Sequence, residues 1–214
     1  MKRLVGIGLI MLLAGRAALA AESGRTILLL GDSIGAGYGV PAEASFAALL
    51  QRRLEFGHPG WKIVNVSVSG DTTAGGLRRV DWVLKRPADI LLIELGGNDG
   101  LRGVQPEETL RNLEGIIDRA RRRRPGIRII LAGMQMPANM GETYTSAFRA
   151  VFPAVARSRS VNLIPFLLEG VGAKPEFNQP DLIHPNAAGH RRVAENVWPI
   201  LAKVLATAQS AASE

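Results

Sequence analysis

Five short apolar runs alternate with five longer segments of helical periodicity, and this alternation constrains the fold more than any other feature of the chain. A strand that is apolar on both faces must be covered on both sides, so the pattern predicts a parallel sheet between two layers of helices. The predicted strands are residues 26–30, 62–66, 89–95, 127–132 and 161–164, and the predicted helices are residues 44–56, 73–85, 106–123, 143–157 and 187–206. In such an α/β fold the carboxyl ends of the strands meet at one edge, where ligands bind.

The first twenty residues have the composition of a secretory signal peptide. Lys2 and Arg3 precede an apolar stretch at residues 4–13, and Ala18 to Ala20 offer a cleavage site of small residues. The stretch is shorter than the roughly twenty residues that a membrane-spanning helix needs, although an uncleaved anchoring segment is the alternative. We therefore expect a signal peptide at residues 1–20, a periplasmic or secreted protein, and one domain at residues 21–214 with a frayed tail at 207–214. The chain has no cysteine, so the exported domain must be held by its core alone.

The charge of the chain argues against a nucleic-acid partner. Loss of Lys2, Arg3 and Arg16 with the signal peptide would lower the formal net charge from +7 to +4. Many remaining cations lie at residues 119–124, the end of a predicted helix, where they complement the negative end of the helix dipole. Only 5% of residues are aromatic, whereas single-stranded nucleic acids are bound by aromatic side chains within a basic groove.

Ser33 is placed where a nucleophile would be useful. It follows the apolar run 26–30 in the sequence Gly31-Asp32-Ser33, at the carboxyl end of the first predicted strand. A serine that only caps the next helix is the alternative. A serine nucleophile needs a nearby imidazole, and that imidazole needs a carboxylate to orient it. The other parts of the chain therefore decide between the two interpretations.

His184 is the histidine best placed to serve as the base. Asp181 lies three residues before it, and Pro185 holds it in an extended conformation. His58 lies in a turn on the far side of the predicted sheet, where we expect it to be solvated. His190 falls inside the last predicted helix, where we expect a partly exposed packing role.

An anion formed during attack on an ester would need donors at the same edge. The candidates are the backbone N–H groups of Ser33 and Gly70 and the side-chain amide of Asn98, which follows two glycines after the third predicted strand. The alternative is that Gly70 and Asn98 only supply positive φ angles in turns.

These segments together resemble the four sequence blocks of the SGNH (GDSL-type) hydrolases, in order. Gly-Asp-Ser contains Ser33, Gly70 stands in its own block, Gly-x-Asn-Asp contains Asn98, and Asp-x-x-His contains Asp181 and His184. The wider match over residues 94–103, 137–141 and 183–186 is similar to the branch of exported bacterial arylesterases, thioesterases and lysophospholipases. One departure is Ile34, where the family signature has leucine, a nearly volume-neutral exchange.

The resemblance implies a flavodoxin-like three-layer α/β/α sandwich with a five-stranded parallel sheet. It implies Ser33 as nucleophile, His184 as base, Asp181 as the carboxylate that orients it, and Ser33, Gly70 and Asn98 as an oxyanion hole. It also implies a serine esterase that acts on small acyl esters, thioesters or lysophospholipids. We further expect a monomer that needs no cofactor and no metal.

Other functions fit the sequence less well. Gly37-x-Gly39-x-x-Ala42 formally matches a dinucleotide-binding turn, but Pro41 falls inside it and the next strand does not end in an acid. Three scattered histidines without cysteine do not make a metal cluster. A sugar-binding domain without activity would be expected to lack one of the four blocks.

The substrate is less constrained than the reaction. Flexible apolar side chains could line an acyl groove, or could equally be ordinary core: Met134, Met136, Met140, Leu182 and Ile183. A deacetylase acting on a polysaccharide or cell-wall sugar, with a short polar pocket, is the alternative activity.

Overall fold

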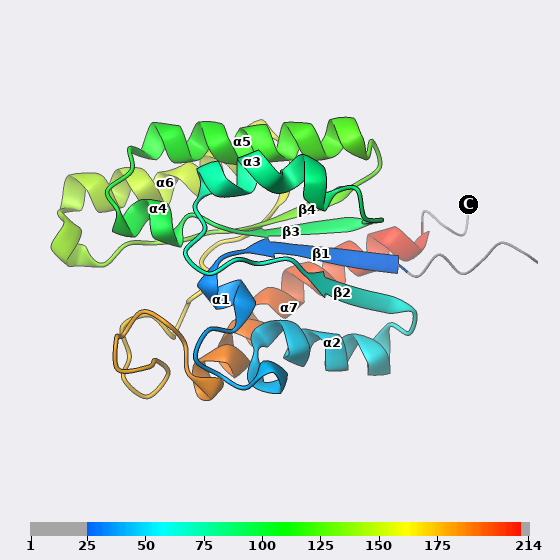
Figure 1. Cartoon of the computed structure of the whole chain (residues 1–214), viewed down its shortest axis with the longest axis horizontal. Helices are drawn as coiled ribbons and strands as arrows, with labels where there is room; N and C mark the ends of the chain where they lie inside the picture. Colours follow the sequence, from blue (N-terminus) through cyan, green and yellow to red (C-terminus); the bar gives the residue numbers. More distant parts are fainter. Residues whose placement is uncertain (1–24, 211–214) are drawn as a thin grey trace, which may run out of the picture.

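The computed structural model describes residues 25–210. Its centre is a parallel sheet in the order β2-β1-β3-β4-β5 (Figure 1). The strands are β1 (Arg25–Gly31), β2 (Trp61–Asn65), β3 (Ile90–Glu94), β4 (Arg128–Ala132) and β5 (Asn162–Ile164). Each strand predicted from the sequence is present, and the prediction of a five-stranded parallel sheet is confirmed.

Helices cover both faces of the sheet. One face carries α3 (Thr73–Val83), α5 (Pro106–Arg123) and α6 (Glu142–Ser158), and the other carries α2 (Phe46–Gly57) and α7 (Ala187–Ser210) (Figure 1). The three-layer α/β/α prediction is therefore confirmed. The strand order reverses between β1 and β3, and in sheets of this topology the crevice beyond the carboxyl ends of those two strands binds the ligand.

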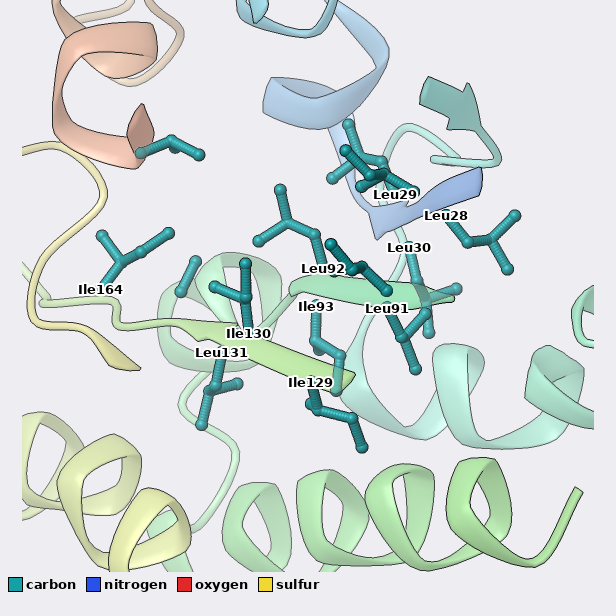
Figure 2. Close-up of a cluster of buried hydrophobic side chains, with 14 of the residues drawn as sticks. Leu28, Leu29, Leu30, Leu91, Leu92, Ile93, Ile129, Ile130, Leu131 and Ile164 are labelled. Carbon is teal, nitrogen blue, oxygen red and sulfur yellow. The ribbon is translucent and has the colours of Figure 1, made fainter. Parts of the chain in front are cut away.

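The core lies on both sides of the central strands. Leu28, Leu91 and Ile129 occupy the same level of the adjacent strands β1, β3 and β4 and are buried (Figure 2). Burying an aliphatic side chain of this size contributes roughly 1.5–3 kcal/mol. Runs that are apolar on both faces are stable only between two helical layers, which is why the sequence pattern identified the architecture.

Local signals in the sequence set the starts of the helices. The Ser45 hydroxyl accepts the Ala48 N–H at the start of α2, and the Thr72 hydroxyl accepts the Gly75 N–H at the start of α3. Pro106 occupies the first turn of α5, where its missing N–H removes no hydrogen bond.

Some boundaries differ from the sequence prediction. Pro153 lies inside α6 without ending it, because the carbonyl that loses its partner belongs to the exposed Arg149, where water can replace the missing donor. Helix α7 continues to Ser210 with Ala208 buried, whereas the sequence analysis expected a frayed tail from residue 207. The predicted signal peptide and residues 211–214 lie outside the described residues.

Short helices follow two strands directly, where the sequence predicts loops. They are α1 (Ser33–Ala36) and α4 (Gly97–Leu101), and two 3-10 turns, η1 (Ala42–Ala44) and η2 (Ala138–Met140), lie further along the connections. Helices of four or five residues have no sequence periodicity to reveal them. Within residues 25–210, no helix has the length and apolar character needed to cross a membrane.

Candidate active site

Ser33 is held at the start of a short helix that begins directly after β1. The Asp32 carboxylate caps this helix by accepting the Ile34 N–H at 3.0 Å, and Gly37 ends it with a φ of 73°. Ser33 is thereby the first residue of α1, and it is 9% exposed. The first N–H groups of a helix have no partner within the helix, and that of Ser33 has no acceptor within the described chain.

The structure brings Ser33, His184 and Asp181 into one hydrogen-bonded chain. Ser33 Oγ lies 3.0 Å from His184 Nε2, and His184 Nδ1 lies 2.6 Å from Asp181 Oδ2. The other Asp181 oxygen accepts the backbone N–H groups of Ile183 at 2.9 Å and His184 at 3.0 Å. Burial opposes the charge on Asp181, but these hydrogen bonds from His184 and Ile183 lower its pKa to about 2. A permanently charged carboxylate can hold the imidazole in the tautomer that accepts a proton at Nε2.

The loop that carries this pair is shaped by its backbone. The Gln179 N–H donates to the His184 carbonyl at 2.8 Å, and the Gln179 side chain donates to the Tyr38 carbonyl at 2.8 Å. Leu182 has a φ of 57°, a left-handed conformation that costs a residue other than glycine roughly 1–2 kcal/mol. This turn allows Asp181 to reach the backbone and the ring of His184 together. The Tyr38 ring packs 4.8 Å from the imidazole.

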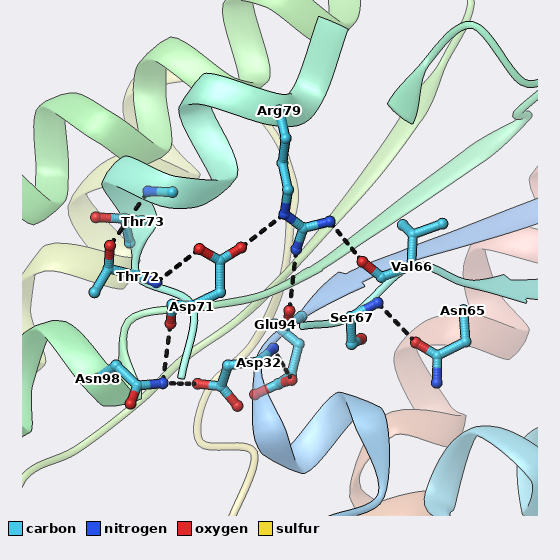
Figure 3. A network of polar contacts seen from close by, with 12 residues as sticks. Asp32, Asn65, Val66, Ser67, Asp71, Thr72, Thr73, Arg79, Glu94 and Asn98 are labelled. Atoms are coloured by element: carbon cyan, nitrogen blue, oxygen red, sulfur yellow. Dashed lines mark hydrogen bonds and ion pairs between the residues drawn. The ribbon is translucent and has the colours of Figure 1, made fainter. Parts of the chain in front are cut away.

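Asn98 links the segments that carry the predicted oxyanion donors. It lies in α4, and its Nδ2 donates to Asp32 Oδ2 at 3.1 Å and to the Asp71 carbonyl at 2.9 Å (Figure 3). Asp32 precedes Ser33 and Asp71 follows Gly70, so the amide sits between the two backbone donors. Gly70 has a φ of 79°, and its N–H has no acceptor among the residues that the structure describes. Both hydrogens of Asn98 Nδ2 are already engaged, so an arriving oxyanion must share one of them.

Arg79 supports the Gly70 loop, and sequence reasoning missed it. Its Nε pairs with Asp71 Oδ2 at 2.7 Å, and its two terminal nitrogens donate to the carbonyls of Val66 and Gly31 (Figure 3). One guanidinium on α3 therefore joins the ends of β1 and β2 to the turn that contains Gly70. No local pattern marks Arg79, because its partners come together only when α3 packs on the sheet.

The two other histidines lie elsewhere, and neither matches its expected exposure. His190 is 0% exposed, so the prediction of a partly exposed role is wrong. Its Nδ1 accepts the Phe46 N–H at 3.2 Å, and burial lowers its pKa to about 4. His58 is half-buried rather than solvated, because its ring packs 5.9 Å from that of Trp198.

The predicted acyl-binding residues differ in their exposure. Met134 is 2% exposed and belongs to the core, which is the alternative that the sequence left open for it. Met136 is half-buried and packs closely against Gly100, and Met140 is also half-buried. Leu182 and Ile183 are 44% and 42% exposed beside His184.

Large apolar side chains are exposed mainly on segments that follow the carboxyl ends of strands. Of the seven in the described chain, five lie on segments that follow the carboxyl ends of strands: Tyr38, Val68, Leu101, Leu182 and Ile183. Sequence reasoning missed the first three. Exposed apolar groups collected at one place mark a binding surface.

Comparison with known proteins identifies the family of this chain. The model of the GDSL-like lipase/acylhydrolase family matches residues 29–192, which include Ser33 and His184. The chain belongs to this family. Esterase TesA of Pseudomonas aeruginosa is 43% identical over 201 residues, covering 91% of this chain and 98% of that protein. The thioesterase 1/protease 1/lysophospholipase L1 of Escherichia coli K12 is 40% identical over 189 residues, covering 87% and 86%.

Solved structures agree with this assignment. The psychrotrophic esterase EstA from Pseudoalteromonas sp., inhibited by monoethylphosphonate, has a TM-score of 0.79 to this chain at 30% identity, covering 85% of this chain and 98% of EstA. With this family and these relatives, the chain is a carboxylic ester hydrolase.

Proposed function

We propose that Ser33 is the nucleophile of a two-step acyl transfer, in which His184 is the base and Asp181 orients it. The observation that carries the proposal is the continuous contact from Ser33 Oγ to His184 Nε2 at 3.0 Å and from His184 Nδ1 to Asp181 at 2.6 Å. His184 takes the Ser33 proton as Oγ attacks the acyl carbonyl, then gives it to the leaving group. Water follows the same route to release the acid from the acyl-enzyme.

The carbonyl oxygen becomes negative during attack, and three donors converge on it in this proposal. They are the N–H groups of Ser33 and Gly70, which have no acceptor within residues 25–210, and the Asn98 amide. Donors that are in place before the reaction stabilise the developing charge without further reorganisation. Asn98 shares one of its hydrogens with the oxyanion while the other stays on the Asp71 carbonyl.

The proposed substrates are esters and thioesters of medium or long acyl chains, including lysophospholipids. Five exposed apolar side chains lie on segments that follow strand ends, as Ser33 does, and Tyr38, Leu182 and Ile183 lie on the segments next to His184. Contact with an acyl chain would remove this apolar surface from water. The names of the relatives, which include thioesterase and lysophospholipase, support the same substrate class. Export to the periplasm, after removal of residues 1–20, is part of the proposal and rests on the sequence alone.

Labelling with a fluorophosphonate probe tests the nucleophile. We expect the wild-type enzyme to be labelled and Ser33→Ala to be unlabelled and inactive with an unchanged circular dichroism spectrum. Ser69→Ala is the matched control, because Ser69 is an exposed serine at the same edge. Continued labelling of Ser33→Ala would contradict the proposal.

A series of p-nitrophenyl esters from acetate to long chains tests the substrate class. We expect kcat/KM to peak at medium or long chains. A preference for acetate alone would instead favour a deacetylase with a short polar pocket.

A further inference from the structure

Two acidic side chains meet inside the protein, directly beneath the turn that carries Ser33. Asp32 is 2% exposed, and Glu94, the last residue of β3, is 0% exposed. Glu94 Oε2 accepts the Asp32 N–H at 3.1 Å and the Gly35 N–H at 2.8 Å (Figure 3 draws both acids). A carboxyl group on β3 therefore binds the backbone on both sides of Ser33.

The two glycines of the Gly-Asp-Ser-x-Gly segment make room for this carboxyl group. A Cβ on Gly31 would collide with Glu94 Oε2, and a Cβ on Gly35 would lie only 2.7 Å from it. Backbone N–H groups can approach the acid this closely only because neither residue has a side chain. The position of Glu94 and the position of the Ser33 turn are thus set together.

The pair has the hydrogen bonds of one acid and one carboxylate. Glu94 Oε2 accepts the backbone N–H of Asp32 itself, so the two buried acids are close neighbours. Two negative charges this close would repel each other, which favours one proton on the pair. Asp32 also accepts from the Ile34 N–H and from Asn98 Nδ2, which suits a charged carboxylate. Glu94 Oε1 is buried and has no donor among the described residues. Each oxygen of Asp32 has a donor, whereas Glu94 Oε1 has none in the described chain, and a buried charged oxygen without a donor is costly. The proton therefore belongs on Glu94.

The surrounding charges agree with a proton on Glu94 and a negative charge on Asp32. Burial raises the pKa of Glu94 well above its ordinary value, and the charge of Asp32 raises it further. Burial also raises the pKa of Asp32, to about 6, although the Ile34 N–H, Glu94, His184 and Asn98 oppose the rise. On the β2 side, the cation of Arg79 is directed to Asp71 and to backbone carbonyls.

We propose that Glu94 is a positioning residue that carries the proton shared with Asp32 and, through Asp32, holds the Asn98 amide beside Ser33. The inference rests on the function proposed above for Ser33 and Asn98. Asp32 contributes one negative charge, which keeps Asn98 Nδ2 in place and faces His184. An ionised Glu94 would add a second charge close to the place where the oxyanion forms, and like charges would oppose that step. A neutral Glu94 keeps the hydrogen bonds and removes the repulsion.

Infrared spectroscopy of the free enzyme tests the proton directly. We expect wild-type protein at pH 7 to show the carbonyl stretch of a protonated carboxylic acid. The band should vanish in Glu94→Gln and persist in Asp32→Asn. Glu107→Gln, a substitution at an exposed glutamate in the first turn of α5, is the matched control and should keep the band. Absence of the band in wild type, or its survival in Glu94→Gln, would overturn the proposal.

Thermal unfolding as a function of pH gives a second test without substrate. A carboxyl group whose pKa is raised on folding stabilises the folded protein at pH values below its unfolded pKa. This stabilisation is lost as the pH rises towards the folded pKa. Glu94→Gln does not titrate, so its Tm should rise relative to that of wild type between pH 4.5 and pH 8. A Tm difference that does not change with pH would contradict a proton on Glu94.

Kinetics tests the positioning role. Glutamine can still accept the two N–H groups and donate to Asp32, so Glu94→Gln should keep kcat within about threefold. Glu94→Ala removes these bonds and should lower kcat about tenfold or more with little change in KM, less than the roughly 10²–10³-fold cost of losing an oxyanion donor outright. Equal kcat values for the two variants would refute the positioning role. If Glu94→Ala does not fold, the infrared and Tm results decide whether Glu94 carries the proton. The infrared band and the Tm do not depend on turnover. A result showing that Ser33 is not the nucleophile would come separately, from the labelling experiment.

Discussion

The buried imidazole of His190 sets an acid limit on the stability of this esterase. Its pKa is lowered from 6.5 to about 4 because the ring lies in the core between α7 and the start of α2. As the pH falls, His190 therefore becomes protonated near pH 6.5 in the unfolded chain but only near pH 4 in the folded protein. The stabilisation present above pH 6.5 is lost as the pH falls through this window. At 1.36 kcal/mol for each pKa unit, the full loss is about 3 kcal/mol.

Urea unfolding at pH 7.5 and pH 4.5 measures this contribution. In His190→Gln the amide oxygen can still accept the Phe46 N–H, but nothing titrates at this position. We expect the free energy of unfolding of wild type to fall between the two pH values by roughly 2–3 kcal/mol more than that of the variant. The raised pKa values of Asp32 and Glu94 act in the opposite direction but are common to both proteins, so the difference isolates His190.

His58→Gln is the control, because His58 lies at the end of α2 outside the core. The free energy of unfolding of His58→Gln should change between the two pH values as that of wild type does. If wild type and His190→Gln lose stability in parallel, the reasoning from burial is refuted. The variant also separates two causes of acid inactivation: loss of activity while the protein is still folded reports protonation of His184, the proposed base.

Three substitutions at the site have outcomes that the structure specifies. Asn98→Ala should lower kcat by roughly 10²–10³-fold, because it removes an oxyanion donor; a loss of only about twofold would reassign Asn98 to a turn role. Asp181→Asn should lower kcat by about 10²–10⁴-fold, since an amide would present a donor to His184 Nδ1 and favour the wrong tautomer; wild-type kcat would show that the short contact to Asp181 is dispensable. Leu182→Gly relieves a φ of 57° and removes a largely exposed side chain, so unfolding in urea should show a change within about 1 kcal/mol, not the 2–5 kcal/mol of a core leucine. Its KM should rise for long-chain esters but not for acetate, and a uniform rise would argue against acyl contact.

Much of the site could be placed from the sequence because its groups follow strand ends. A parallel sheet brings the carboxyl ends of its strands to one edge, so Ser33 after β1, Gly70 after β2 and Asn98 after β3 had to converge. Asp181 and His184 are three residues apart, so a single turn was enough to predict their contact. These predictions depended on local spacing and on one general rule of topology.

Burial was harder to predict than position. His190 was expected to be partly exposed, and for Met134 the sequence left groove and core open; both lie inside the core. Whether a residue near the end of an element is covered depends on helices from distant parts of the chain. For His190 the covering element is α2, whose first residue lies 144 positions earlier.

The sequence by itself determined the layered α/β architecture and the pairing of Asp181 with His184, because apolar periodicity and short spacings are local properties. The resemblance to the SGNH hydrolases implied the pairing of Ser33 with His184, which is 151 residues away in the chain. Only the tertiary structure decided how that chemistry is supported. Arg79 joins two strand ends to the Gly70 turn, and Glu94 fills the space left by Gly31 and Gly35 beneath Ser33. Both act across strands that are distant in sequence, and the need of a buried polar group for a partner is settled only when those strands are packed together.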